Sequence, residues 1–220
     1  QSCRPTHVHK CDICCDISVK VHTTDPGATW TTTDFRQLQT QKLAAVPICN
    51  NNIRYAVDGA NVNGSELQRT SKSTDGGMTW TALANDPTNG SAYSIFADPN
   101  DANHVVVSDY NTLYGSTNAG VTFAQKYHTN NNNAGLHIAG AFFDGNNIYV
   151  GTNEGVLLST DGGASFAKAS ISGIPPNEYI VGFAGAKAGS ITRFFCVTLS
   201  QVYAGITGAD KDGFKNVYKM

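Results

Sequence analysis

A short motif that recurs four times along the chain constrains the fold more than any other feature. Two copies are nearly identical: Ser-Thr-Asp-Gly-Gly-Met-Thr-Trp at residues 73–80 and Ser-Thr-Asp-Gly-Gly-Ala-Ser-Phe at residues 159–166. Looser copies occupy residues 116–123 and 23–30, with Asn118 at the aspartate position of one and Pro26 inside the other. The aromatic residues that end the copies are 50, 43 and 43 residues apart. This period is typical of a unit of four short β-strands, as in one blade of a β-propeller.

The residues inside the motif favour a tight turn between two strands. The aspartate can accept hydrogen bonds from nearby backbone N–H groups, and glycine supplies the positive φ that such a turn requires. The first Ser or Thr can add a second local bond, and the final aromatic can anchor the hairpin in the core. The residues expected in these roles are Thr23, Asp25, Gly27, Trp30, Ser73, Asp75, Gly77, Trp80, Ser116, Asn118, Gly120, Phe123, Ser159, Asp161, Gly163 and Phe166.

These copies resemble the Asp-box, or BNR repeat, of sialidases, xyloglucan-hydrolysing enzymes and sortilin-type receptors (Ser-x-Asp-x-Gly-x-Thr-Trp). The resemblance covers nearly the whole chain except its first sixteen residues and implies an Asp-box β-propeller. In those families the motif joins the third and fourth strands of a blade at its periphery, away from the catalytic centre. It therefore implies an architecture and hardly any chemistry.

We expect an all-β, propeller-like array of four-stranded antiparallel blades over residues 17–220, preceded by a Cys- and His-rich tail over residues 1–16. Charged residues make up only 15% of the chain, against about 25% in an average soluble protein, which argues against a helical bundle. Alternating or apolar runs between turn residues predict the strands. Their ranges are 17–22, 29–33, 43–48, 53–57, 67–73, 79–83, 93–96, 104–107, 113–116, 122–125, 138–143, 148–151, 156–159, 165–167, 180–183, 193–198 and 214–218.

The predicted units are incomplete at both ends of the chain. Residues 17–22 and 29–33 correspond to the third and fourth strands of a unit, and residues 180–218 to the first three. An unpaired strand edge tends to pair with another strand. Three arrangements are open: closure of the two ends into a small four-bladed ring, a piece of a larger propeller, or an edge that takes a strand from another molecule. In the last case residues 6–13 are a candidate donor, and repeated exchange would form a polymer.

The cysteines favour an oxidising compartment, because they are even in number and four of them lie in the first fifteen residues. Asn63 and Asn89 begin Asn-x-Ser sequons in loop-like sequence, where a glycan can be attached. We therefore predict a secreted, disulfide-linked protein whose cysteine pairing the sequence leaves open. The disulfide candidates are Cys3, Cys11, Cys14, Cys15, Cys49 and Cys196.

The tail also suggests a metal hypothesis. Cys11 and Cys14 form a Cys-x-x-Cys pair near His7 and His9, a set of ligands suited to zinc. All four come from one short stretch without a second distant pair, so disulfides are the favoured interpretation and we expect no metal or cofactor. A net charge of −2 gives no electrostatic reason to bind nucleic acid. No apolar run approaches the ~20 residues that a membrane-spanning helix needs.

Glycoside hydrolysis is the enzymatic activity that the resemblance implies. It requires two carboxylates, or in sialidases a tyrosine with an acid partner. The carboxylates outside the motifs are Asp58, Glu66, Asp98, Asp101, Asp109, Asp144, Glu154 and Glu178. Most lie in turn sequences, where capping of the turn is the simpler interpretation. The Arg-Ile-Pro segment of sialidases is absent, and 220 residues cannot contain the two seven-bladed propellers of the xyloglucan-hydrolysing enzymes.

Sugar binding without catalysis is a further hypothesis. Tyr110, Tyr114 and Tyr127 lie near Asn111 and an asparagine-rich run, although packing between blades is the simpler interpretation of these tyrosines. We therefore assign no catalytic residue. We predict a non-catalytic extracellular scaffold or binding protein that acts through self-association or recognition of a glycan or protein. The alternative is a glycoside hydrolase or a fragment of one, for which paired acids in an open cleft would be the structural evidence.

Overall fold

A computed structural model describes residues 19–22, 31–34, 39–44, 52–171, 173–200 and 214–220 of the chain. The regular structure in these ranges consists of β-strands, and no helix occurs within them. All strand pairs that form the sheets are antiparallel. The prediction of an all-β fold is confirmed.

Three sheets have four strands each, and their strands pair in chain order. The first contains β3 (Gln39–Ala44), β4 (Arg54–Val62), β5 (Ser65–Ser73) and β6 (Thr81–Ala82). The second contains β7 (Ser94–Ala97), β8 (Val105–Ser108), β9 (Thr112–Ser116) and β10 (Ala124–His128). The third contains β11 (Ile138–Asp144), β12 (Asn147–Thr152), β13 (Gly155–Ser159) and β14 (Ala167–Lys168). These are the meanders expected of propeller blades.

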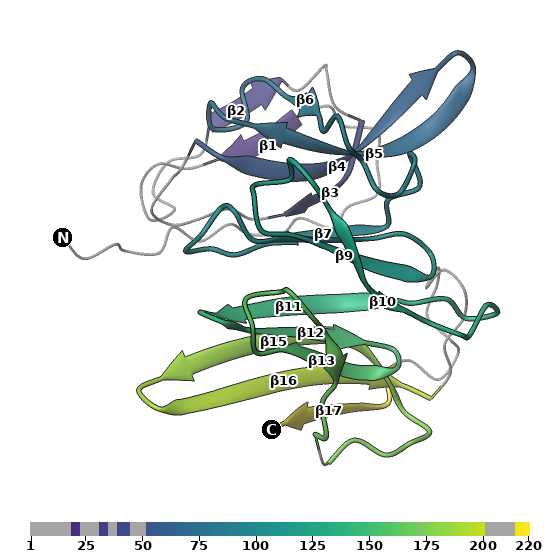
Figure 1. The fold of residues 1–220 in the computed structure, drawn as a ribbon, viewed down its shortest axis with the longest axis vertical. Coiled ribbons are helices and arrows are strands. Elements are labelled where there is room, and N and C mark those ends of the chain that lie inside the picture. Colours follow the sequence, from purple (N-terminus) through teal and green to yellow (C-terminus); the bar gives the residue numbers. More distant parts are fainter. Residues whose placement is uncertain (1–18, 23–30, 35–38, 45–51, 172, 201–213) are drawn as a thin grey trace.

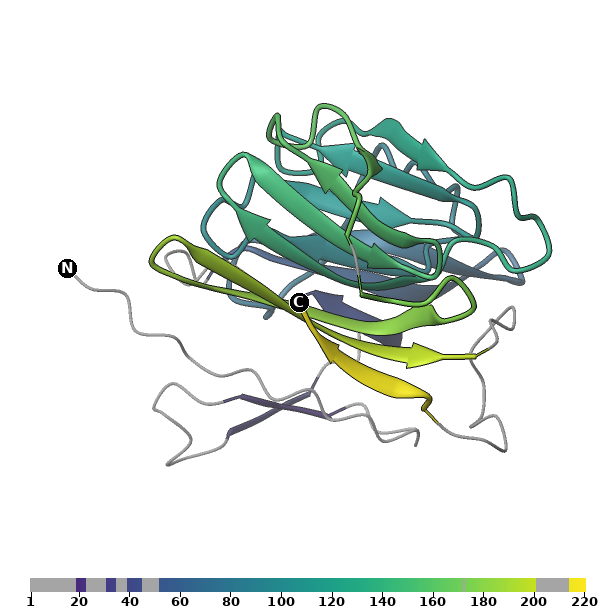
Figure 2. The same cartoon turned by 90° about the horizontal axis from the view of Figure 1, so that it is seen from below.

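Two smaller sheets come from the ends of the chain. The terminal sheet contains β15 (Tyr179–Ala188), β16 (Ile191–Leu199) and β17 (Asn216–Lys219), and a two-stranded sheet contains β1 (Val19–His22) and β2 (Thr31–Asp34). Figure 1 shows the sheets stacked from β3–β6 at one end to the terminal sheet at the other. Figure 2 views the stack from the end that carries β17. Among the described strands, none joins the β1–β2 sheet to the terminal sheet.

The order of the strands agrees with the sequence prediction, but one strand lies elsewhere. The strand predicted at residues 43–48 is β3, which begins at Gln39 and ends at Ala44, and residues 45–51 are outside the described ranges. Pairing with β4 decides its position, because Gln39 lies opposite Gly59 and Ala44 opposite Tyr55. β3 begins with polar residues that are held in the strand by pairing with β4, and a pattern of apolar residues does not indicate such a strand.

The hydrophobic core lies between neighbouring sheets, so each inner sheet buries both faces. One cluster joins the first two complete sheets around Tyr55 and Val107, and a second joins the next two around Val106 and Val150. The third cluster lies between the β11–β14 sheet and the terminal sheet. Its members include Val156, Ile180, Phe183, Phe194 and Cys196.

Two glycines allow the terminal sheet to pack closely against the sheet before it. A Cβ atom added at Gly140 would clash with the backbone carbonyl of Phe183, and one at Gly151 would clash with the Phe183 side chain. The Phe183 ring also stacks on Phe194, with 5.4 Å between their centroids. The absence of a side chain at these glycines therefore sets the spacing between the two sheets.

Candidate functional sites

The repeated motif folds as a hydrogen-bonded turn, the first candidate site. In the copy at residues 73–80, Ser73 Oγ accepts the N–H of Gly77 at 2.8 Å and donates to Asp75 at 2.7 Å. Asp75 also accepts the N–H and the hydroxyl of Thr79 at 2.9 and 2.6 Å, and the Trp80 indole donates to the Gly77 carbonyl. The bonds from Thr79 and Ser73 lower the pKa of Asp75 from 3.8 to about 2. Its carboxylate therefore stays charged and acts as a structural acceptor.

The copy at residues 159–166 repeats this network. Ser159 Oγ accepts the N–H of Gly163 at 2.8 Å, and Asp161 accepts the N–H and hydroxyl of Ser165 at 2.9 and 2.6 Å. The bonds from Ser165, followed by the one from Ser159, hold the pKa of Asp161 well below its usual range. Two distant segments thus build the same local structure from equivalent residues, apart from the indole bond of Trp80, which Phe166 cannot make.

The copy at residues 116–123 shows how an amide replaces the carboxylate. Asn118 Oδ1 accepts the N–H of Thr122 at 2.9 Å, while its Nδ2 donates to the Thr122 hydroxyl at 2.8 Å. Ser116 Oγ accepts the N–H of Gly120 as in the other copies. The copy at residues 23–30, with Thr23, Asp25, Gly27 and Trp30, is outside the described residues.

The turns also connect neighbouring sheets. Lys72 on β5 donates to the carbonyl of Ala119 in the next turn at 3.1 Å, and Lys126 on β10 donates to that of Ala164 at 2.8 Å. Each described turn joins the third and fourth strands of its sheet: β5 to β6, β9 to β10 and β13 to β14. The turns therefore stabilise the stack, and their polar groups are used within it.

The candidate carboxylates are divided between the two rims of the stack. The strands of a meander alternate in direction, so its connections alternate between two rims of the stack. The connections from first to second strand and from third to fourth strand lie at one rim, here called the turn rim. The connections between second and third strands and the links between sheets share the other, the loop rim, on the right in Figure 1. Glu66, Asp109, Glu154 and Glu178 belong to the loop rim, and Asp98, Asp101 and Asp144 to the turn rim.

The structure brings together two candidates that the sequence analysis considered separately, Tyr127 and Glu154. The Tyr127 hydroxyl donates to Glu154 Oε2 at 2.6 Å, and Lys168 forms an ion pair with the same oxygen at 3.0 Å. The Thr129 hydroxyl donates to Glu154 Oε1. Burial by itself raises the pKa of Glu154, but the bonds from Thr129, Tyr127 and Lys168 outweigh it and hold the pKa below its usual value. Burial and the bond to Glu154 raise the pKa of Tyr127.

These shifts describe a structural bridge better than a catalytic pair. A nucleophilic tyrosine needs a lowered pKa, and a general base needs a free lone pair directed at substrate. Here the proton is held on Tyr127, and three donors occupy the Glu154 carboxylate. The bridge ties β10 and the segment after it to the β12–β13 connection of the next sheet.

Glu178 is held in a similar way within the terminal sheet. It accepts bonds from the hydroxyls of Thr198 and Tyr218 at 2.6 and 2.9 Å and from the side-chain amide of Asn216 at 2.8 Å. The bond from Thr198 leads the interactions that lower the pKa of Glu178. The sequence pattern indicates neither arrangement, because the hydroxyl donors are 20 to 40 residues away from their glutamate in the chain.

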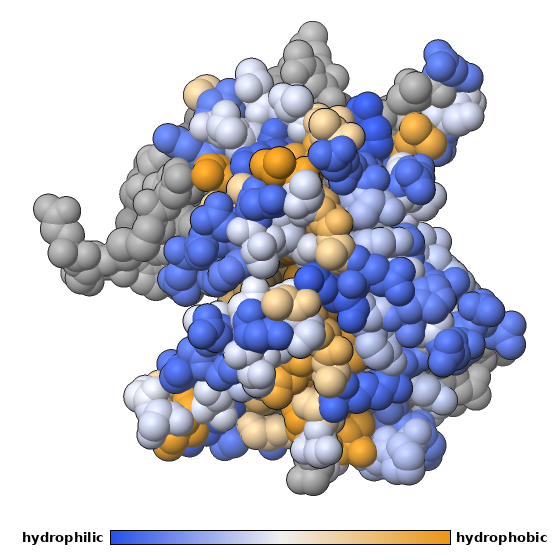
Figure 3. All heavy atoms as spheres, in the orientation of Figure 1, coloured by the Kyte–Doolittle hydropathy of each residue, from blue (hydrophilic) through white to orange (hydrophobic). Residues whose placement is uncertain are grey.

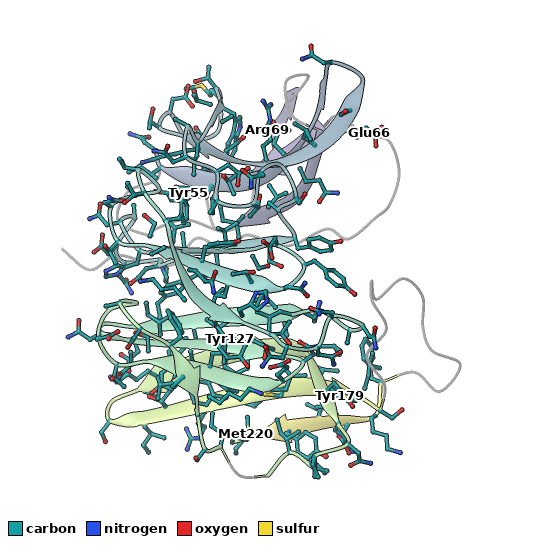
Figure 4. The ribbon with its side chains drawn as sticks, turned by 45° about the vertical axis from the view of Figure 1, so that its right-hand side comes forward. Tyr55, Glu66, Arg69, Tyr127, Tyr179 and Met220 are labelled. Carbon is teal, nitrogen blue, oxygen red and sulfur yellow. The ribbon has the colours of Figure 1, made fainter. Side chains whose placement is uncertain are left out.

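Among the other candidate carboxylates, all of them in the described part of the chain, one has no structural partner described. Asp98, Asp101 and Asp109 each accept the N–H of the residue two positions later, which caps a turn. Asp144 pairs with Lys187 at 2.8 Å, and buried Asp58 lies 3.6 Å from Arg69. Burial raises the pKa of Asp58 despite Arg69. The exception is Glu66, which is exposed and lies on the β4–β5 hairpin away from Tyr127 (Figure 4).

The tyrosines considered for sugar stacking also form hydrogen bonds within the protein. Tyr110 donates to the carbonyl of Asn133 at 2.9 Å, and Tyr114 donates to Asp109 at 2.9 Å. Tyr93, which no sequence motif marks as a binding residue, is exposed and contacts Tyr110 edge-on with ring centroids 5.9 Å apart. Tyr93 is thus an exposed aromatic residue at the loop rim, and the Tyr110 ring beside it is held by its bond to the asparagine-rich connection.

The described residues include only some of the positions to which the cysteine, sequon and metal predictions refer. Cys196 is a free thiol in the core, in place of the disulfide expected for it, and burial raises its pKa to about 11. Cys3, Cys11, Cys14, Cys15 and Cys49 are outside the described residues, as is the tail with its zinc hypothesis. Within the described part of the chain, no cluster of His, Cys, Asp or Glu could hold a metal ion.

Both sequon asparagines are exposed, Asn63 with a φ of 53° and Asn89 with a φ of 52°. Each precedes a glycine that also has positive φ, so each asparagine lies at the tip of a tight turn. The side chains are therefore accessible to modification.

The terminal sheet carries a surface that the sequence analysis did not predict. Its outer face, defined here by Ala184, Phe195, Val197 and Val217, lies on the side opposite the buried Phe194 and Cys196. Phe195 and Val217 are 45% and 72% exposed. Apolar residues are visible at this end of the stack in Figure 3. In the preceding sheet, Phe142 and Tyr149 pack against the terminal sheet, so the corresponding face there is covered.

Comparison with solved structures supports this architecture. The fold is similar to that of a GH74 enzyme from Niastella koreensis, with a TM-score of 0.56 and 20% identity over 82% of this chain and 28% of the enzyme. An ancestral GH74 enzyme is similar at a TM-score of 0.54 and 20% identity, over 77% of this chain and 23% of that enzyme. No protein-family model and no curated protein matches the sequence.

The fold and these likenesses define a class: a β-propeller-like protein of stacked antiparallel sheets. The particular likeness is to propeller enzymes of the GH74 type, of which this chain spans about a quarter of the length. At this level of identity the likeness concerns the fold. In the described part of the chain, no helix has the length and apolar character needed to cross a membrane.

Proposed function

We propose that the chain is a non-catalytic extracellular scaffold or binding protein built from Asp-box blades, which acts through self-association or recognition of a glycan or protein. The observation that carries this proposal is the outer face of the terminal sheet. Phe195 and Val217 expose large apolar surface there, and one edge of the sheet has no described partner strand. Exposed apolar surface of this kind is typical of interaction sites.

The state of the carboxylates supports the same proposal. Glu154, the best-positioned candidate base, is occupied by a tyrosine, a threonine and a lysine. Glu178 is occupied by three further donors, and the turn-rim aspartates cap turns or pair with lysine. Such groups contribute to stability, and they are poorly placed to transfer protons to a substrate.

The experiment that tests the proposal measures association and hydrolysis on the same preparation. We expect light scattering to show species above the chain mass of 23.3 kDa, or a glycan or peptide screen to show binding. We also expect no release of sugar from xyloglucan or sialyl conjugates. Hydrolysis by the wild type that is lost in the Glu154→Gln variant would contradict the proposal.

The second candidate is a glycoside hydrolase or a fragment of one. The likeness to two GH74 enzymes favours it, together with the hydrogen-bonded Tyr127–Glu154 pair at the loop rim. Because the chain spans about a quarter of those enzymes, this candidate requires further blades to complete a cleft. Activity that appears only when this chain is part of a longer propeller would support it.

A further inference from the structure

The free edge of β17 is the part of the terminal sheet best suited to bind a partner. β17 pairs with β16 on one side, and no described strand pairs with its other side. Phe194 and Met220 exchange both backbone bonds at 2.9 Å. Because residues of an antiparallel strand alternate in direction, the N–H and C=O groups of Val217 and Lys219 point toward the free side. An edge of this kind is a template for an added strand.

The side chains along this edge have a simple pattern. Val217 and Lys219 are exposed and lie on the outer face of the sheet, and Lys215, immediately before β17, is also exposed. Arg193 on β16 is exposed on the same face. The strands β15, β16 and β17 contain no acidic residue. The edge therefore presents an apolar residue between two cations. Glu178, just before β15, lies within electrostatic reach of Lys215 but already accepts hydrogen bonds from Thr198, Asn216 and Tyr218.

This charge pattern selects against a second copy of the chain. If two β17 strands paired across a two-fold axis at Val217, Lys219 of each copy would lie opposite Lys215 of the other. Like charges directly opposite each other destabilise a strand pair. The outer face of the terminal sheet of one copy also has no exposed surface to stack on at the other end of a second copy. That end is the far face of the β3–β6 sheet, where Ala56, Asp58, Ser71 and Ser73 are already buried.

We infer that the free edge of β17 accepts an extended acidic strand from a partner protein as the fourth strand of the terminal sheet. The partner strand carries an apolar residue opposite Val217 and an acidic residue two positions away on each side, opposite Lys215 and Lys219. This inference rests on the proposed function and names its partner class. Main-chain bonds supply affinity in such strand addition, and alternate side chains supply specificity.

The other sheets show that a short strand is sufficient for this place. Their fourth strands β6 and β14 have only two residues each and β10 has five. β17 itself has four residues. A seven-residue segment is therefore long enough to pair along the whole edge.

The test uses the 220-residue chain and a fluorescent Thr-Asp-Thr-Val-Thr-Asp-Thr peptide with blocked ends. We expect saturable binding by fluorescence anisotropy that weakens as salt is raised, because exposed charge pairs are screened. One control peptide has lysine at both aspartate positions. A second keeps every side chain but is N-methylated at the amides that would face β17. Neither control is expected to bind.

Matched variants locate the site. Val217→Asp is expected to weaken binding about tenfold or more, since it places a carboxylate opposite the valine of the peptide and near its two aspartates. Val121→Asp makes the same change at another exposed valine, 62% exposed, and is expected to bind as the wild type. The double variant Lys215→Glu with Lys219→Glu is expected to prefer the lysine peptide.

Three results would overturn the inference alone. The first is equal binding of the acidic and lysine peptides, and the second is undiminished binding of the N-methylated peptide. The third is self-association of the wild type that Val217→Asp abolishes, which identifies a second copy as the occupant and leaves the proposed function intact. A chain that binds no peptide or glycan and stays at 23.3 kDa contradicts both the inference and the proposed function.

Discussion

The β11–β14 sheet and the terminal sheet have similar strands but different surroundings. In the first, Phe142 and Tyr149 face the next sheet and pack against Phe194. In the second, Phe195 lies on the corresponding face and is 45% exposed. The same alternation of side chains thus produces a covered face in one sheet and an open face in the other. The comparison shows that an apolar strand face becomes a core or a binding surface depending on what lies against it.

The strongest test of the comparison uses two adjacent phenylalanines. Phe194 stacks on Phe183 inside the third cluster, whereas Phe195 points to the outer face. We expect Phe194→Ala to lower the free energy of unfolding by about 3–5 kcal/mol, because it leaves a cavity in a packed interface. Phe195→Ala should cost well under half of that. Urea titration followed by circular dichroism measures both, and equal losses would show that the outer face is covered in solution.

A second test compares two glycines at similar places in their sheets. A Cβ at Gly140 clashes with Phe183, whereas one at Gly182 meets the nearest atom, Val197 Cβ, at 3.4 Å. We expect Gly140→Ala to destabilise by about 1–3 kcal/mol through overpacking. Gly182→Ala should be close to neutral in thermal unfolding. A large loss at Gly182 would place another element against the terminal sheet.

A third test concerns the two bridging glutamates. Glu154→Gln leaves Tyr127, Thr129 and Lys168 without a charged acceptor between two sheets, and we expect a loss of about 1–3 kcal/mol. Glu178→Gln affects the more open terminal sheet, where water can replace the lost bonds, and should cost less. Denaturant midpoints give the ranking. A reversed ranking would mean that the terminal sheet depends on its glutamate more than the inner stack does.

The smallest effect is expected at the repeated turn, where carboxylate and amide copies can be compared. The pKa of Asp75 falls from 3.8 to about 2 on folding, so its contribution is present above pH 3.8 and is lost as the pH falls toward 2. Asp75→Asn imitates Asn118 and should remove this part of the acid sensitivity while it preserves the turn. Melting temperature measured between pH 5 and pH 2 tests this. An unchanged pH profile in the variant would assign the acid sensitivity to other groups.

Local structure could be predicted from the sequence because its interactions span few residues. The side-chain bonds of Ser73, Asp75 and Thr79 lie within one eight-residue copy, so the motif alone indicates the turn. The period of the copies then predicts the number and order of the strands. The sequence also shows that Asn118 stands where the other copies have aspartate. Only the structure shows that the amide makes one bond as an acceptor and one as a donor, where the carboxylate accepts both.

The sequence by itself thus determined the turns, the strand order and the all-β class, since each depends on hydrogen bonds and periodicity within a unit. Tertiary structure decided where β3 lies, which hydroxyls occupy Glu154 and Glu178, and which apolar face stays open. Those outcomes depend on residues brought together across long separations, such as Tyr127 with Glu154 and Tyr218 with Glu178. Side-chain alternation assigns residues to two faces of a strand, but only the packing of whole sheets decides which of those faces meets water.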